Sequence, residues 1–196
     1  MSASQDILNQ VQQVLSNVKQ VDLSDKATLG SNFIFLYHTM KASENLLKVA
    51  ANNASTEELR QYCIHHLAEE KSHEKWLAED LLSVGIDVTK TIIPIEAVEM
   101  CGSIYYLICH LDACALLGYM LLMECFPMNL SLLGYYESIH GKQLFRTARY
   151  HAENDISHGK DILEMIDKLP PTEQSIVKQT AFQSAIYFNR AIERLL

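Results

Sequence analysis

Apolar residues recur at helical spacing along most of the chain. Ile7, Val11 and Val14, for example, stand three or four positions apart, so they fall on one face of a helix. No stretch alternates β-branched and polar residues between turn residues, and no β-strand is therefore predicted. The pattern predicts seven helices, over about residues 1–22, 26–53, 55–83, 94–126, 129–140, 142–169 and 171–196.

Glycine and proline mark several of the helix ends. Gly85 and Gly141 follow predicted helices, whereas Pro94 and Pro171 stand where helices begin. The chain has only 7 Gly and 4 Pro in 196 residues, which leaves little room for β-turns or flexible linkers. We therefore predict one all-α domain, a bundle over residues 1–196, in which the N-terminal helix of residues 1–22 is peripheral to the core.

The most apolar run, residues 104–126, is long enough to suggest a membrane span. It nevertheless carries His110, Asp112 and Glu124, and the flanking loops show no excess of positive charge. A helix buried on most sides of a bundle explains this run better, so no membrane association is predicted.

The overall charge excludes two classes of partner. A formal net charge of −8 and a pI near 5.4 argue against nucleic acids and anionic membranes, because both need clustered lysine and arginine. The five cysteines form no Cys-x-x-Cys pair, and the N-terminus lacks the features of a signal peptide. These features predict a protein of the reducing cytoplasm.

The segment HHLAEEKSHEKW, residues 65–76, concentrates histidine and glutamate. At about 100° per residue, His66, Glu70 and His73 stand at positions i, i+4 and i+7 and share one helix face. Glu69 and Glu74 point elsewhere and are expected to be solvated. The segment therefore divides into a stripe of imidazole, carboxylate and imidazole and a stripe of surface charge.

A second stripe of the same kind occurs near the end of the chain. In YHAENDISHGKDIL, His151, Asp155 and His158 have the same i, i+4 and i+7 spacing. Either stripe alone is compatible with a surface helix that happens to carry histidines. Two of them in a protein with 8 histidines favour a common site.

Two further glutamates are candidates for that site. Glu124, in ALLGYMLLMECF, is costly to bury unless it is paired, protonated or bound to a cation, although it could reach solvent near Pro127. Glu44, in FLYHTMKASENLL, is either a surface residue or a ligand.

Together these residues form a donor set of carboxylate and imidazole without thiolate. Such a set suits iron or manganese better than structural zinc. Helix bundles build two-metal sites from inward Glu and Glu-x-x-His residues, but within the two His and acid stripes Glu70 and His73 form the only such pair. The site of ferritin-like proteins is therefore not matched.

These motifs together resemble those of the haem-oxygenase-like iron-containing redox enzymes. The resemblance rests on HHLAEEKSHEKWLAEDLLSVGID, on the inward Glu of LLGYMLLMEC and on the later His-x-x-x-Asp-x-x-His, and it covers roughly residues 30–185. It implies a bundle of about seven helices, related to the thiaminase II (TenA) and pyrroloquinoline-quinone synthesis proteins. It also implies a di-iron centre that activates dioxygen to oxidise a small metabolite of the amino acid or fatty acid class, and a homodimer.

By motif matching, the resemblance assigns metal ligands and leaves one position open. The implied ligands are His73, Glu124, His151, Asp155 and His158, with Asp155 or Glu124 as the bridge. Many relatives have a carboxylate seven residues before the first of these histidines, where this chain has His66. Either Glu70 or Glu44 would then complete the coordination, and Tyr37 is a candidate for orienting an imidazole.

Three other functions remain open at the level of sequence. A haem oxygenase would use His38, in HTMKASEN, as its axial ligand, although no glycine-rich distal helix is visible. A metal-free hydrolase of the thiaminase II type would use a cysteine nucleophile such as Cys114 or Cys125. The third alternative is a helical protein that binds a ligand or partner without catalysis.

Overall fold

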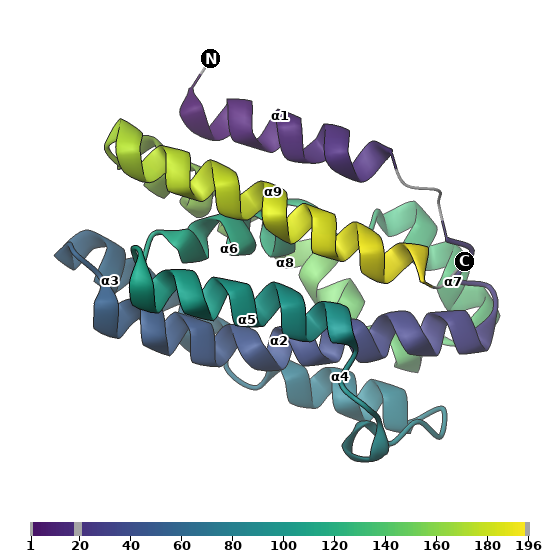
Figure 1. Cartoon of the computed structure of the whole chain (residues 1–196). Helices are drawn as coiled ribbons and strands as arrows, with labels where there is room; N and C mark the ends of the chain where they lie inside the picture. The colour runs from purple at the N-terminus through teal and green to yellow at the C-terminus, as the bar shows by residue number, and fades with distance from the viewer. Residues whose placement is uncertain (1, 18–20, 195–196) are drawn as a thin grey trace.

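The computed structural model describes residues 2–17 and 21–194, apart from the side chains of Asp155 and Ile156. These residues form nine α-helices and two short 3-10 helices, with no strand among them (Figure 1). The elements are α1 (Ala3–Ser16), α2 (Lys26–Asn53), α3 (Glu57–Glu70), α4 (His73–Leu82), η1 (Val88–Lys90), α5 (Ile95–His110), α6 (Ala115–Cys125), α7 (Leu130–His140), η2 (Lys142–Phe145), α8 (Arg146–Lys168) and α9 (Pro171–Glu193).

The prediction of an all-α domain is confirmed, but the number of helices is nine rather than seven, because two predicted helices are broken. The segment 55–83 divides at Ser72, which adopts a left-handed conformation with a φ of +76°. The segment 94–126 divides after His110, where the backbone N–H of Cys114 donates to the Asp112 carboxylate at 2.8 Å. Neither break contains glycine or proline, so the apolar pattern runs through both.

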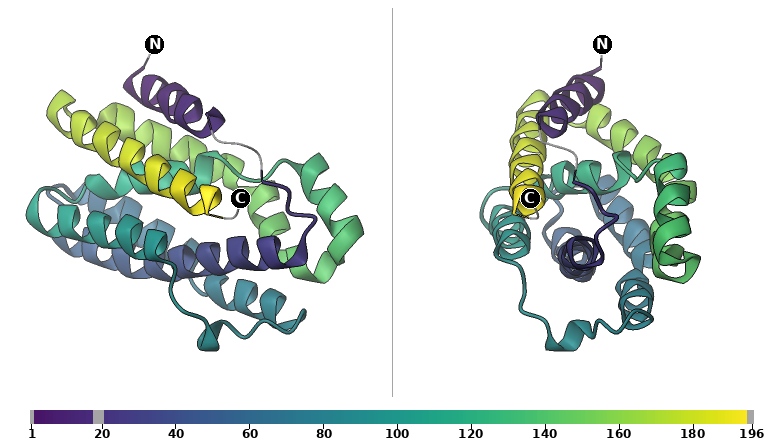
Figure 2. Two further views of the ribbon diagram at one scale, coloured as in Figure 1. Left: turned by 45° about the vertical axis from the view of Figure 1, so that its right-hand side comes forward. Right: turned by 90° about the vertical axis from the view of Figure 1, so that its right-hand side faces the viewer.

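α6 lies at the centre of the bundle, with every residue from Ala115 to Leu122 buried. It packs mainly against α9 and α8, while α5 and α2 lie alongside and α1 runs along the outside of α9 (Figures 1 and 2). The approach to α9 is close at Gly118, where an added Cβ would lie 2.2 Å from Thr180 Oγ1 and 2.4 Å from the Ala181 nitrogen. A glycine at this position lets the two helix backbones touch.

The buried side chains form two clusters. The first core cluster surrounds α6 and includes Leu59 of α3 and Ile104 of α5. The second core cluster joins the N-terminal half of α2 to α4, α7 and η2, and includes Phe33, Leu77 and Phe145. α2 is long enough to contribute to both, so it is the element that ties the two clusters together.

The N-terminal helix α1 also contributes to the first core cluster. Ile7 and Val11 are buried there, and the backbone N–H and hydroxyl of Ser4 donate to the carboxylate of Asp167 at 2.9 and 2.8 Å. Within the described residues no single helix has the length and apolarity to cross a membrane, and α6 with α7 passes that test only as a pair bent by 66°.

Relieving the left-handed conformation of Ser72 is expected to stabilise the protein. A non-glycine residue in this region costs about 1 kcal/mol or more, so Ser72→Gly should raise the free energy of unfolding by about 1 kcal/mol in urea titrations. Ser83→Gly is the matched control, because Ser83 has an ordinary φ of −59° and should lose up to about 1 kcal/mol. A loss of stability in Ser72→Gly would contradict this interpretation.

Candidate metal centre

Four helices direct histidine or glutamate side chains toward one interior region. On α3, the buried residues Leu59, Cys63, His66 and Glu70 follow one another at helical spacing, so the polar pair continues an apolar face inward. The break at Ser72 then starts α4 with His73, which is also buried. Glu124 comes from the end of α6, and His151 and His158 come from α8.

The first ligand group consists of His66, Glu70, Glu124 and His158, all buried. Each residue offers one donor atom, and these atoms lie within 4.8 Å of one another. His158 Nδ1 lies 3.2 Å from one oxygen of Glu124, and His66 Nε2 lies 3.7 Å from the other. This spacing is suited to a metal ion among them.

The second ligand group consists of Glu70, His73 and His151, whose donor atoms also lie within 4.8 Å of one another. His73 Nδ1 lies 3.4 Å from Glu70 Oε2, and the rings of His73 and His151 are 5.0 Å apart and nearly perpendicular. Glu70 therefore belongs to both groups, and its two oxygens can serve two neighbouring ions.

Several donor atoms of these groups are buried without a hydrogen bond to any described residue. They are His66 Nε2, Glu70 Oε1 and His73 Nδ1. A buried polar group left without a partner costs about 1–3 kcal/mol, so three in one place need an explanation. Nitrogen and oxygen donors left open toward a common point fit a bound cation.

The electrostatics keep Glu124 ionised. Burial opposes its charge, but the hydrogen bond with His158 and the electrostatic interactions with His66 and His151 outweigh burial and lower the pKa of Glu124. Burial raises the pKa of the Cys63 thiol, on the same face of α3, to about 12. Carboxylate rather than thiolate is therefore the anionic ligand available here.

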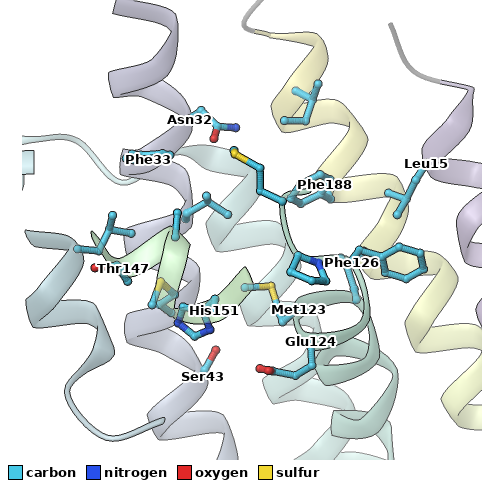
Figure 3. A pocket seen from close by; sticks show the side chains of 18 of the residues that line it. Leu15, Asn32, Phe33, Ser43, Met123, Glu124, Phe126, Thr147, His151 and Phe188 are labelled. Atoms are coloured by element: carbon cyan, nitrogen blue, oxygen red, sulfur yellow. The ribbon is translucent and has the colours of Figure 1, made fainter. Parts of the chain in front are cut away.

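A cavity of about 410 Å³ opens beside the two ligand groups. Glu70, Glu124 and His151 contribute to its wall, and most of the remaining lining is apolar, as with Phe33 and Phe188 (Figure 3). A cavity of this size is within the range of sites for small molecules. The ligand groups can therefore act on a molecule bound next to them.

The structure separates two predicted residues from this centre. Glu44 is in neither ligand group; its carboxylate pairs with Lys48, one turn along α2, and remains partly exposed. Tyr37 packs in the second core cluster and makes an edge contact with His38. The side chain of Asp155 lies outside the described residues, although the α8 backbone passes through this position.

Other residues next to the ligands were not predicted from sequence. Glu69, expected to be solvated, lies 3.6 Å from His66 Nδ1 and 3.7 Å from His158 Nε2, so it can orient both rings. Tyr62 stacks on His66 with ring centres 5.5 Å apart, and Trp76 packs against His73 at 4.3 Å. Trp76 stands three positions after His73, a spacing that could have suggested the contact.

A third group of possible ligands lies elsewhere. Asp112, Cys114 and Glu173 come together where α6 and α9 begin, and two of the three are only partly buried. Burial raises the pKa of Cys114. None of the three residues lines the cavity.

Comparison with known proteins identifies the fold but no sequence family. No protein family model matches the sequence, and no curated protein matches it significantly. Among solved structures, a domain of unknown function with a haem-oxygenase-like fold from Shewanella denitrificans is 18% identical with a TM-score of 0.74, and the match covers 98% of this chain and 86% of that one.

Two TenA homologues have the same architecture. The one from Pseudomonas syringae is 12% identical with a TM-score of 0.74, covering 97% of this chain and 91% of its own. The one from P. horikoshii is 9% identical with a TM-score of 0.76, covering 100% and 98%. At such low identity these similarities establish the fold alone: the chain has an all-α haem-oxygenase-like fold.

Proposed function

We propose that the protein is a non-haem di-iron oxidase that uses dioxygen to oxidise a small metabolite. The observation that carries this proposal is the sharing of Glu70 by two ligand groups in which every residue but His151 is buried. One ion would be held by His66, Glu124 and His158, the other by His73 and His151, with Glu70 between them. Asp155, one turn from each histidine of α8, is the further ligand implied by the family resemblance.

The donor set supports iron, with manganese as the alternative metal. When bound, a pair of ferrous ions supplies the electrons that reduce dioxygen. The chain itself holds the ligands in place: Glu69 and Tyr62 position His66, and Trp76 limits rotation of His73. The mostly apolar cavity next to the ligands would limit access of water and would hold a substrate beside the metal pair.

The alternatives have less support from the site. His38 does not line the cavity, and burial, together with the charge of Lys41, lowers its pKa. Neither Cys114 nor Cys125 lines the cavity, so neither thiol could attack a molecule bound in it. A helical protein that only binds a ligand would use the cavity but would not take up metal.

Anaerobic titration with ferrous iron, followed by metal analysis, tests the proposal. We expect two iron ions per chain and a higher melting temperature, because a ligand that binds only the folded state stabilises it. When the iron-loaded protein is then exposed to air, it should consume dioxygen, and its optical spectrum should change.

The control for this titration is Glu44→Gln. Because Glu44 pairs with Lys48 and is in neither ligand group, this variant should still bind two ions per chain. A wild-type protein that binds no iron would refute the di-iron proposal and favour the non-catalytic alternative. Loss of one ion in Glu44→Gln would refute the assigned ligand set.

A further inference from the structure

The cavity beside the ligand groups has its charged groups at one end. Of its described lining residues, only Glu70, Glu124 and His151 are ionisable, and all three belong to the ligand groups. No lysine or arginine is found in this lining. Among the described lining residues, an ammonium or carboxylate group placed away from the metal centre would therefore find no ionic partner and would contact mostly apolar side chains, which is unfavourable.

One uncharged polar side chain of the lining has no hydrogen bond to any described residue. Asn32 of α2 is only 6% exposed, faces the cavity, and makes no hydrogen bond to any described residue (Figure 3). The lining's other hydroxyl and amide side chains are already bonded: Ser43 to Tyr119, Thr147 to Asp80, and Asn189 to the carbonyl of Val14.

An amide in this position can pair with a ligand. Asn32 neighbours the buried ring of Phe33 and lies across the cavity from Glu124 and Ser43 (Figure 3). Its carbonyl accepts and its NH2 group donates, so it can pair with a hydroxyl, carbonyl or carboxamide but cannot neutralise a charge. The Asn32 amide is not among the fully buried side-chain groups that lack a partner, so it is accessible from the cavity to a bound molecule.

We propose that the cavity takes an elongated, mostly apolar substrate with one uncharged polar group, and that Asn32 selects that group by hydrogen bonding. The other end of the substrate lies at the metal centre; this last point rests on the proposed function. Substrates with a charged group at the end away from the metal centre are excluded, since that charge would have no partner among the described lining residues. Simple alkyl carboxylates leave Asn32 unpaired.

Displacement of the neutral fluorophore N-phenyl-1-naphthylamine from the full chain tests this inference, without metal and again with Mn²⁺. Octanamide, octanoate and 8-aminooctanoate are the competing probes. Without metal, octanamide should bind at least tenfold more tightly than octanoate, because Glu70 and Glu124 repel a carboxylate. It should also bind at least tenfold more tightly than 8-aminooctanoate, because one of the two charges of that probe must lie away from Glu70 and Glu124. Equal binding of 8-aminooctanoate would overturn the proposal.

Asn32→Leu isolates the contribution of the amide. The variant should bind octanamide about tenfold more weakly, with or without Mn²⁺, because one buried hydrogen bond is lost. Its melting temperature should equal or exceed that of the wild type, since an unpaired amide is replaced by an apolar group of similar size. Asn45→Leu, at an exposed position of the same helix, is the control and should change neither quantity.

The outcomes separate this inference from the di-iron proposal. Unchanged octanamide binding in Asn32→Leu would overturn the inference. A lower melting temperature of this variant would assign Asn32 a structural role and would also overturn it. The assay without metal does not depend on iron uptake, whereas the titration above does not depend on Asn32. If the chain binds octanamide but no iron, the proposed ligand class is supported and the proposed oxidase function is refuted.

Discussion

Gly118→Ala is expected to cost about 3 kcal/mol or more of folding stability, at or above the upper end of typical overpacking penalties. The added methyl group would meet Thr180 Oγ1 at 2.2 Å, the Ala181 nitrogen at 2.4 Å and the Val177 carbonyl at 2.5 Å. Two of these are backbone atoms of α9, so the clash can be relieved only if α6 and α9 move apart along an extensive interface. Urea unfolding and the yield of soluble protein measure the effect.

Gly102→Ala provides the matched control. Gly102 lies within α5, and nothing stands within 4 Å of an added Cβ. Alanine favours helix over glycine by up to about 1 kcal/mol, so this variant should be slightly more stable than the wild type. If Gly118→Ala changed stability by less than the control does, the close packing of α6 and α9 would not be essential.

Glu70→Gln is expected to reduce iron binding from two ions per chain to at most one. Glu70 is the carboxylate shared by both ligand groups, so loss of its charge weakens both positions at once. The metal-free variant should stay folded, because Glu70 Oε1 has no hydrogen-bond partner to lose. Metal analysis after anaerobic loading gives the stoichiometry, and circular dichroism checks the fold.

Glu69→Gln is the comparison variant for this position. Its carboxylate lies beside His66 and His158 at 3.6 and 3.7 Å and is in neither ligand group. We expect it to keep two ions but to bind them about 10- to 100-fold more weakly, as is typical for residues that orient ligands. Equal stoichiometry in the two variants would show that Glu70 is not a shared ligand.

Helical spacing in the sequence indicated which candidate ligands lie near one another, but it did not indicate the helix breaks or the residues around the ligands. The i, i+4 and i+7 rule brought out His66, Glu70 and His73 together, and the structure does place them near one another. The helix breaks at Ser72, so His66 and His73 lie on different helices, but His73 is still buried and close to Glu70. The two extra helices were missed because neither break contains glycine or proline.

The sequence did not distinguish the candidate polar residues that lie inside the bundle from those that lie at its surface. Glu44 and Glu124 are both glutamates among apolar residues, yet one pairs with Lys48 on the surface of α2 and the other is 3% exposed. In the sequence, Asn32 does not differ from other polar residues of a helix. Only the structure shows that it faces the cavity. Such distinctions depend on which helices pack together, which spacing within one helix does not specify.

The candidate metal centre lies at the boundary between the first and second core clusters. α3 is anchored in one through Leu59 and Cys63, and α4 in the other through Leu77 and Leu81. Ions bound by residues of both helices, through Glu70 and its neighbours, would link the two core clusters. Filling the centre would thus couple the two clusters more strongly, and this would be visible as slower amide hydrogen exchange on both sides of their boundary.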